Sequence, residues 1–205
     1  ISKFKKPLIL STGMNDLNKT KEIYKFLKKR KVKFAFLHTT SLYPTPDNLV
    51  RLNALNEMRK EFSNLILGYS DHTLCLNACT TAISMGASII EKHFTDTKKR
   101  NGPDIICSMD PKDLKELIIK SKKIFNQLKG SKNYLKQEEV TRKFAFVSVV
   151  SDREIKKGEK FTKENLWVRR PGTGDFRQTD LKFLYGKKSS KKIAPNMQIK
   201  KNHIA

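Results

Sequence analysis

Two short polar motifs close apolar runs that have the composition of buried strands. A Ser-Asp-His motif closes the run 65–70, and a Glu-Lys-His motif closes the run 88–94. Side chains two apart along a strand point to the same face, and neighbouring parallel strands lie about 4.8 Å apart. We therefore expect the imidazoles of His72 and His93 to lie within common reach of one metal ion.

The same two motifs place oxygen donors beside the histidines. Ser70 shares a strand face with His72, and Glu91 shares one with His93. Two imidazoles with nearby oxygen donors suit Mn²⁺, Mg²⁺ or Zn²⁺. The pattern is equally compatible with two strand-end histidines that only form structural hydrogen bonds, and the residues alone leave both interpretations open.

Hydroxyl groups follow the first two strands that the sequence predicts. A Ser-Thr-Gly motif at residues 11–13 follows the strand 7–11, and a Thr-Thr-Ser motif at residues 39–41 ends the strand 34–39. Hydroxyls next to helix N-termini are good phosphate donors, because the helix end adds backbone N–H groups and partial positive charge. Helix capping and turn formation would also account for each motif.

Three loops add further candidate binding groups. Tyr43 lies in a proline-rich loop after the second strand, where its ring would be held rigidly over the mouth of the sheet. Asp104, in a Gly-Pro-Asp motif after the fourth strand, has a carboxylate suited to sugar hydroxyls, although loop aspartates mostly form turns. Residues 169–175 form a stiff cationic loop, which taken alone would be ordinary surface.

These motifs lie on a regular alternation of strands and helices. Helical periodicity follows each of the four predicted strands, and the last helix begins with Asp110 as its N-cap and Pro111 at its first position. One stripe of this helix is apolar and consists of Leu114, Leu117, Ile118, Phe125 and Leu128. Four strand-then-helix units predict a parallel sheet and half of a (β/α)₈ barrel.

The pattern of alternating strands and helices ends after residue 130. We predict an α/β half-barrel over residues 1–130, a lysine-rich linker over 131–143 and a small β-rich module over 144–205. Inside that module, residues 154–166 and 192–204 superpose without gaps. The pattern indicates a compact module with internal pseudo-twofold symmetry.

Composition limits the function further. The 205 residues carry 43 Lys and Arg against 20 Asp and Glu, and both parts of the chain are basic. Zinc spacing, a stacking-aromatic signature and a recognition-helix pattern are all missing, so we expect no specific nucleic-acid partner, whereas an anionic small substrate would be attracted. No apolar run reaches the roughly 20 residues of a membrane span, which predicts a cytoplasmic protein.

Cys75 and Cys79 are expected to be small buried side chains.

Seven segments together resemble the sialic acid synthase family, the bacterial N-acetylneuraminate synthases. They occur in family order over nearly the whole chain, at residues 6–14, 38–46, 68–73, 90–95, 102–109, 144–150 and 165–176. The resemblance implies the second half of a TIM (β/α)₈ barrel followed by an antifreeze-like (SAF) domain, in a domain-swapped homodimer. The N-terminal half of the barrel is then expected to be missing from this chain, which begins at Ile1.

The resemblance also implies a reaction. Phosphoenolpyruvate would condense with N-acetylmannosamine to give N-acetylneuraminate and phosphate, with a divalent metal, Mn²⁺ or else Mg²⁺, on His72 and His93. Glu91 would assist proton transfer. Substrate contacts are implied for Ser11, Ser41, Tyr43, Ser70, Asp104, Phe144 or Phe146, and Arg170, the last reaching the partner subunit's site.

Ser41 departs from the family pattern, where the position is more often Asn. This leaves two other sugars open, the precursors of legionaminic and of pseudaminic acid. A non-enzyme alternative from the charge alone is a basic module that binds sugar phosphates or nucleic acid.

Overall fold

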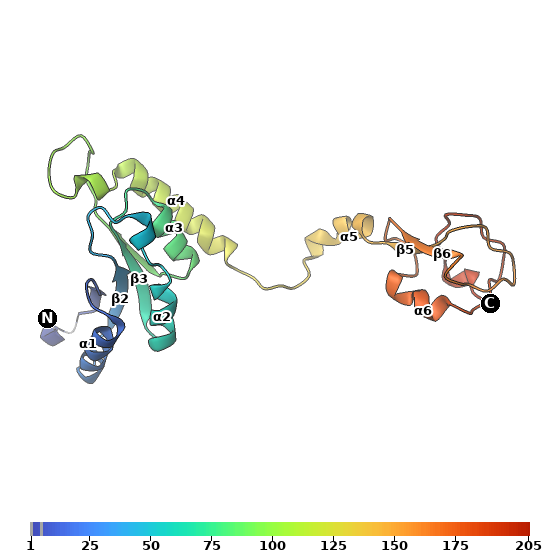
Figure 1. Ribbon diagram of the computed structural model, residues 1–205, viewed down its shortest axis with the longest axis horizontal. Helices are drawn as coiled ribbons and strands as arrows, with labels where there is room; N and C mark the ends of the chain where they lie inside the picture. Colours follow the sequence, from blue (N-terminus) through green and yellow to red (C-terminus); the bar gives the residue numbers. More distant parts are fainter. Residues whose placement is uncertain (1, 5) are drawn as a thin grey trace. The chain divides into compact units, whose positions relative to one another are not determined.

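The computed structural model describes residues 2–4 and 6–205, which form two compact units, residues 1–130 and 131–205. Each unit has its own hydrophobic core and is described by itself (Figure 1). In the described part of the chain, no helix is both long and apolar enough to cross a membrane.

The first unit is built on a four-stranded parallel sheet. Its strands are β1 (Leu8–Ser11), β2 (Phe34–Thr39), β3 (Ile66–Asp71) and β4 (Ile89–Lys92), in that spatial order. Every connection is a strand-to-helix-to-strand crossover, as a parallel pair requires. The predicted half of a (β/α)₈ barrel is confirmed.

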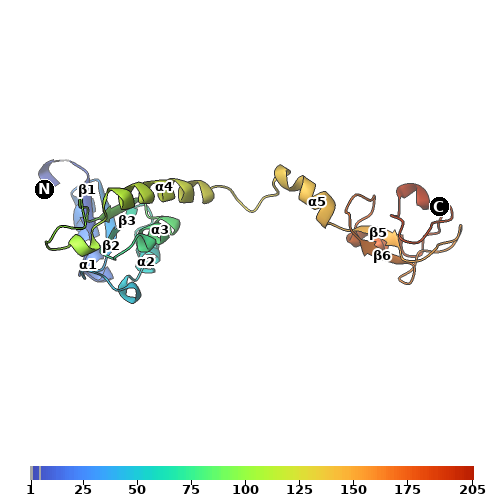
Figure 2. The same ribbon diagram turned by 90° about the horizontal axis from the view of Figure 1, so that it is seen from above.

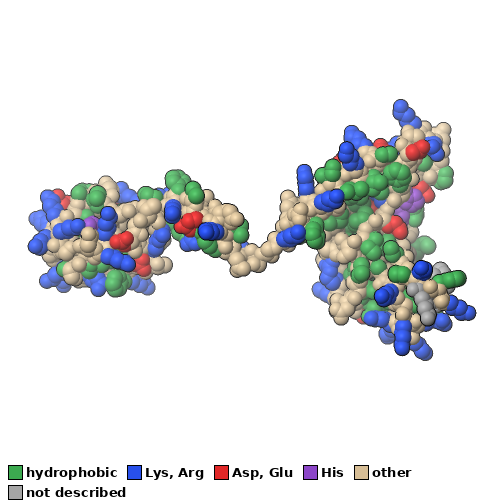
Figure 3. All heavy atoms as spheres, turned by 180° about the vertical axis from the view of Figure 1, so that it is seen from behind, with side chains coloured by type: hydrophobic (Ala, Val, Ile, Leu, Met, Phe, Trp, Pro, Cys, Tyr) green, Lys and Arg blue, Asp and Glu red, His purple; other side chains and the backbone are tan. Residues whose placement is uncertain are grey.

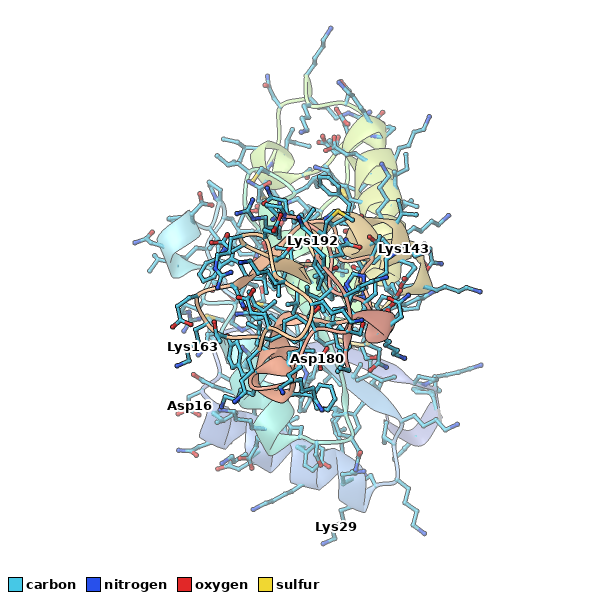
Figure 4. All side chains as sticks on the ribbon, turned by 90° about the vertical axis from the view of Figure 1, so that its right-hand side faces the viewer. Asp16, Lys29, Lys143, Lys163, Asp180 and Lys192 are labelled. Carbon is cyan, nitrogen blue, oxygen red and sulfur yellow. The ribbon has the colours of Figure 1, made fainter. Side chains whose placement is uncertain are left out.

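Four helices connect and flank these strands, as Figures 1 and 2 show. They are α1 (Leu17–Lys29), α2 (Ala54–Glu61), α3 (Asn77–Ser84) and α4 (Pro111–Gln127). Asp16 caps α1 by accepting from the backbone N–H of Lys19, and Figure 4 shows Asp16 and Lys29 at the two ends of this helix. The predicted Asp110-Pro111 start of α4 is confirmed, and Asp113 completes a capping box there.

The helices cover only one face of the sheet. Phe36 of β2 packs on that face against Leu27 of α1 and Phe62, all of them buried. The opposite face is open, and there Ile9 and Ile66 are more than half exposed. The uncovered apolar face that a half-barrel predicts is therefore present.

The apolar stripe of α4 is buried only in its first half. Leu117 joins a core with Cys79 and Met109, whereas Ile118, Phe125 and Leu128 are largely exposed. The expectation of two buried cysteines was wrong for Cys75, which is exposed because it precedes the first turn of α3; all three cysteines are free.

The second unit contains two strands and two helices. Strands β5 (Ser148–Ser151) and β6 (Leu166–Arg169) pair antiparallel, and the helices are α5 (Glu139–Ala145) and α6 (Leu181–Leu184). Short 3₁₀ turns lie at Ser2–Phe4, Asp47–Leu49, Ile105–Cys107, Lys136–Glu138, Gln178–Asp180 and Lys201–His203. The segment predicted as a linker thus contains a 3₁₀ turn and most of α5.

The two copies of the internal repeat, residues 154–166 and 192–204, are related by a pseudo-twofold axis. Ile155 and Ile193, which the sequence alignment equates, exchange both backbone hydrogen bonds with each other, at 2.9 and 2.8 Å. Gly158 and Asn196 are also equivalent, and both have left-handed φ angles, of 81° and 61°. Most residues with a Cβ are strained at such angles, whereas Gly is not and Asn tolerates them, so these two residue types fit the equivalent turns.

Candidate functional site

The two histidines of the strand-end motifs lie side by side at the carboxyl end of the sheet. Their ring centroids are 5.3 Å apart with the planes 70° from parallel. This proximity follows from the register, which pairs Ser70 with Glu91 and so aligns the two residues that follow each of them. The sequence-based expectation that the His72 and His93 imidazoles lie close together is met.

The loop after β2 fixes His72. Its Nδ1 lies 2.9 Å from the carbonyl oxygen of Thr40, so the ring donates from Nδ1 and its Nε2 retains a free lone pair. The backbone N–H of Thr45 donates in turn to the carbonyl of His72, at 2.9 Å. Tyr43 packs against His72, with ring centroids 4.0 Å apart, and meets His93 edge-on, with ring centroids 5.7 Å apart.

Ser70 and Glu91 meet on the open face of the sheet, one residue pair before the histidines. The Ser70 hydroxyl donates to Oε1 of Glu91 at 2.8 Å. Ser70 is buried and Glu91 is exposed. The carboxylate thus has one oxygen engaged and one free at the surface that faces the interior of a closed barrel.

A returning loop brings Asp104 to this place. Residues 93–95 pair with Met109, which donates to the carbonyl of His93 and accepts from Thr95, both at 2.9 Å. Asp104 lies in this loop with a left-handed φ of 61°. Its Oδ2 is 3.9 Å from Nδ1 of His93, close enough for electrostatic interaction but too long for a direct hydrogen bond.

The hydroxyl candidates lie at neighbouring strand ends. Ser11 ends β1 and is exposed, opposite Leu37 of β2 in the register. Ser41 follows β2, and its Oγ lies 3.6 Å from the position that a Cβ on Gly13 would take. The loop after β2 therefore approaches the loop after β1 at Gly13.

The two imidazoles are the side chains that could hold a divalent cation at this edge of the sheet. In the described residues, no group of three or more His, Cys, Asp or Glu could hold a metal, so the chain offers two imidazoles. The Nδ1 bond of His72 to a backbone carbonyl is the support that metal-binding histidines usually have, because it fixes the tautomer that leaves Nε2 free. Remaining positions would be filled by water or a substrate oxygen.

The other candidates belong to the second unit, where they lie close to one another. Arg170 donates from Nε to the carbonyl of Ala145, at 3.0 Å. Ala145 lies between Phe144 and Phe146, and both rings are exposed, by 68% and 47%. Arg170 is therefore bonded to the backbone between the two exposed phenylalanines, and the guanidinium groups that lie over the Phe146 ring are those of Arg142 and Arg177.

Sequence reasoning missed two residues beside the site, Asp71 and Lys92. Nζ of Lys92 lies 2.7 Å from Oδ2 of Asp71, and the two side chains are 2% and 0% exposed. Burial tends to raise the pKa of Asp71, but the hydrogen bond and charge of Lys92, with donors from Thr73 and Tyr69, lower it below the ordinary value. The sequence shows Asp71 and Lys92 only as charged residues near the ends of two strands, and the register of β3 with β4 is what places the two opposite each other.

Asp71 also affects the groups around it. Burial, followed by the nearby Asp71 charge, raises the pKa of Tyr69, whose hydroxyl donates to Oδ1 of Asp71 at 2.9 Å. The pKa of the Cys79 thiol is raised for the same two reasons, and its Sγ lies 3.2 Å from Oδ2. Tyr69 and Cys79 therefore stay protonated at neutral pH and act as donors to the carboxylate.

Comparison with known proteins matches both units. A sequence model of the NeuB family matches residues 1–133, and one of the SAF domain matches residues 146–205. The chain is 38% identical over 182 residues to N,N'-diacetyllegionaminic acid synthase of Campylobacter jejuni, covering 85% of this chain and 53% of the relative. It is 33% identical over 196 residues to pseudaminic acid synthase of the same species, covering 94% and 56%.

A solved structure supports the same assignment. The N-acetylneuraminic acid synthetase of Leptospira borgpetersenii, determined with citrate, superposes with a TM-score of 0.64 at 28% identity, over 68% of this chain and 49% of that one. The chain spans about half the length of the curated relatives it matches.

Proposed function

Because the chain belongs to the NeuB family, the sialic acid synthase family that its motifs resemble, we propose that the full-length protein condenses phosphoenolpyruvate with an N-acetylated aldose. The product is a nine-carbon acid sugar, and inorganic phosphate is released. N-acetylmannosamine is the first candidate sugar. The observation that carries the proposal is the pair of imidazoles 5.3 Å apart at the strand ends, beside Tyr43, Glu91 and Asp104.

The proposed reaction forms one C–C bond and breaks one C–O bond. The enol π electrons of phosphoenolpyruvate attack the open-chain aldehyde carbon of the sugar, and the aldehyde oxygen takes a proton. Water adds to the cationic C2 and loses a proton. The resulting tetrahedral centre expels phosphate with the C–O electron pair, its hydroxyl proton passes to the departing phosphate, and the centre becomes the ketone of the product.

His72 and His93 would hold the divalent cation, Mn²⁺ or Mg²⁺. When bound, it supplies Lewis acidity, which makes a sugar carbonyl more electrophilic. The neighbouring side chains of Tyr43 and Asp104 would contact the sugar. Tyr43 packs against His72 and meets His93 edge-on, which places its ring beside a bound sugar, and Asp104 would offer a carboxylate to sugar hydroxyls.

The open face of the sheet suits the anionic substrate. Ser11 and Ser41 present hydroxyls to phosphate or carboxylate oxygens at neighbouring strand ends, and Ser70 would join them when its hydroxyl turns from Glu91 to the bound anion. Glu91, with Oε1 engaged by Ser70, has Oε2 free to accept a proton from the attacking water. The net positive charge favours the approach of phosphoenolpyruvate, and Figure 3 shows Lys and Arg over the surface of both units.

The second unit contributes a cationic surface in this proposal. Arg170, next to Phe144 and Phe146, would contact the N-acetyl group of a sugar bound to the partner subunit in a domain-swapped homodimer. Phe144 or Phe146 would then close that pocket. The exposure of both rings in the isolated chain is consistent with a surface that is covered in an assembly.

A second candidate sugar has a specific observation in its favour. The relative named as a diacetyllegionaminic acid synthase is 38% identical, more than the other two proteins compared, and Ser41 departs from the family pattern, where the position is more often Asn. The precursor of legionaminic acid is therefore the alternative substrate of the same site. A panel of both sugars, with the pseudaminic acid precursor, decides between them by kcat/KM.

The test is phosphate release by the full-length protein from phosphoenolpyruvate. We expect release only when both an aldose from the panel and Mn²⁺ or Mg²⁺ are present. His72→Ala and His93→Ala should each lower kcat by more than 100-fold, whereas Lys120→Met, on the exposed outer side of α4, should leave it unchanged.

Two results would contradict the proposal. One is full activity after chelation of all divalent metal. The other is no phosphate release with any sugar together with DNA binding that persists at high salt, which would favour a basic binding module.

A further inference from the structure

A buried ion pair joins the two strands immediately before the two histidines. Asp71 precedes His72 and Lys92 precedes His93, and the sheet register places Asp71 directly opposite Lys92. Their charged atoms are 2.7 Å apart, and neither side chain has more than 2% of its surface exposed.

This pair is one of two cross-strand bonds on opposite faces of the sheet. On the open face, Ser70 donates to Glu91 at 2.8 Å. On the helix-covered face, Lys92 donates to Asp71. Because the two bonds lie one residue apart along the strands, they hold the strand ends against both sliding and twisting at the point where the histidines leave the sheet.

The pair also shapes the chain just beyond His72. Asp71 accepts from the backbone N–H and the hydroxyl of Thr73, at 3.0 and 3.1 Å. Lys92 donates to the carbonyl oxygen of Thr73, at 2.6 Å. His72 therefore lies between two residues that are each bonded to Lys92, and Lys92 itself is covalently joined to His93.

We propose that Asp71 and Lys92 are positioning residues that set the spacing and orientation of the His72 and His93 imidazoles for a shared divalent cation. The proposal rests on the proposed function, because it assigns a role toward the cation of that same site. Neither side chain touches substrate or cation, since both lie on the opposite strand face from the open site.

Stability alone does not account for a charged pair here. The desolvation of two buried charges largely offsets their attraction, so an apolar pair of the same size is often as stable. A directional pair instead restricts the strand ends to one geometry. Lys92 reaches two acceptors from one ammonium group, and Asp71 receives donors from Tyr69, Cys79 and Thr73.

The test removes both charges together. A single substitution would leave an unpaired buried charge, which destabilises the fold whether or not the pair positions the histidines. We compare Asp71→Asn/Lys92→Met with Glu116→Gln/Lys120→Met, an ion pair of 2.6 Å on the exposed side of α4. The full-length protein is titrated with Mn²⁺ alone, and free Mn²⁺ is followed by electron paramagnetic resonance. A second readout without metal is the nuclear Overhauser effect between ring protons of His72 and His93.

We expect the Asp71/Lys92 variant to bind Mn²⁺ about 10- to 100-fold more weakly, as for other changes behind metal-binding histidines, and to lose the ring-to-ring signal. The control pair should change neither. Unchanged Mn²⁺ affinity or a persistent ring-to-ring signal in a folded Asp71/Lys92 variant would overturn the positioning role. If the proposed function itself is wrong, the result differs from a failure of the positioning role: His72→Ala and His93→Ala would then bind Mn²⁺ as tightly as the unmodified protein does.

Discussion

Individual side chains at the sheet rim are held by bonds that leave one functional atom free. His72 donates from Nδ1 to a backbone carbonyl and keeps Nε2, and Glu91 accepts at Oε1 and keeps Oε2. The sequence indicates which faces these residues occupy, since strand alternation is strict. It does not indicate the Thr40 carbonyl as the partner of His72, because a backbone acceptor has no sequence signature.

Asp71 and Lys92 show a second limit of reasoning at this scale. A lysine near the end of a strand is usually exposed, and only the register of β3 with β4 reveals that this one is opposite an aspartate under the helices. Cys75 is the opposite case, a residue expected to be buried that is exposed. It lies only four residues from Cys79, but it precedes helix α3, whereas Cys79 lies inside the helix and is buried.

One residue of the second unit gives a pH prediction. The backbone N–H of Lys156 donates to Glu159, and Arg153 lies 2.7 Å from its carboxylate, which together lower the pKa of Glu159 to about 2. Because the folded-state pKa is depressed, ionised Glu159 stabilises the fold above about pH 4.5, and this contribution is lost as the pH falls toward 2. Carbon-detected NMR titration should show the low midpoint.

The matched variant for this prediction is Arg153→Ala, which removes the cation and keeps the backbone donor. The Glu159 midpoint should then move upward but remain below the ordinary value. A midpoint near 4.5 in the unmodified protein would show that the bonds to Lys156 and Arg153 do not form in solution.

At the scale of elements, the sequence predicts the sheet and helices well because their signals are local. The Asp110-Pro111 start of α4 and the four apolar runs each predict an element whose core lies within a few residues of the predicted bounds. Helix α5 was missed because it has only seven residues, and its one apolar pair at helical spacing, Val140 and Phe144, is too short a pattern to indicate a helix. The loop that brings Asp104 to His93 depends on a long-range pairing with Met109 and has no local signal.

A glycine tests how tightly β3 fits its neighbours. A Cβ on Gly68 would lie 2.4 Å from both the carbonyl oxygen of Ile89 and Cδ2 of Leu37, so Gly68→Ala must displace a neighbouring strand. We expect destabilisation of about 1–3 kcal/mol or more by denaturant unfolding.

Gly102→Ala is the control for this strand effect. Its Cβ would meet only a side-chain atom of Ile105, at the ordinary contact distance of 3.6 Å. The change there should stay within about 0.5 kcal/mol. Equal stability of the two variants would mean that β2, β3 and β4 do not pack as described.

At the scale of the whole molecule, the chain consists of two compact units with different internal architecture. The first carries the open strand-end site, and the second is a pseudo-twofold module with Ile155 and Ile193 at its axis. The repeat was visible in the sequence because equivalent positions need the same backbone freedom or the same burial. The exposed apolar residues Ile9 and Ile66 follow from half of a barrel having one sheet face without helices, whereas Phe125 is exposed on the second half of α4.

The most direct test of the central claim is pulsed electron paramagnetic resonance of the full-length protein loaded with one equivalent of Mn²⁺. We predict hyperfine coupling from two imidazole nitrogens, reduced to one in His72→Ala and in His93→Ala. A bound Mn²⁺ without imidazole coupling, or with coupling unchanged in both variants, would contradict the shared cation site.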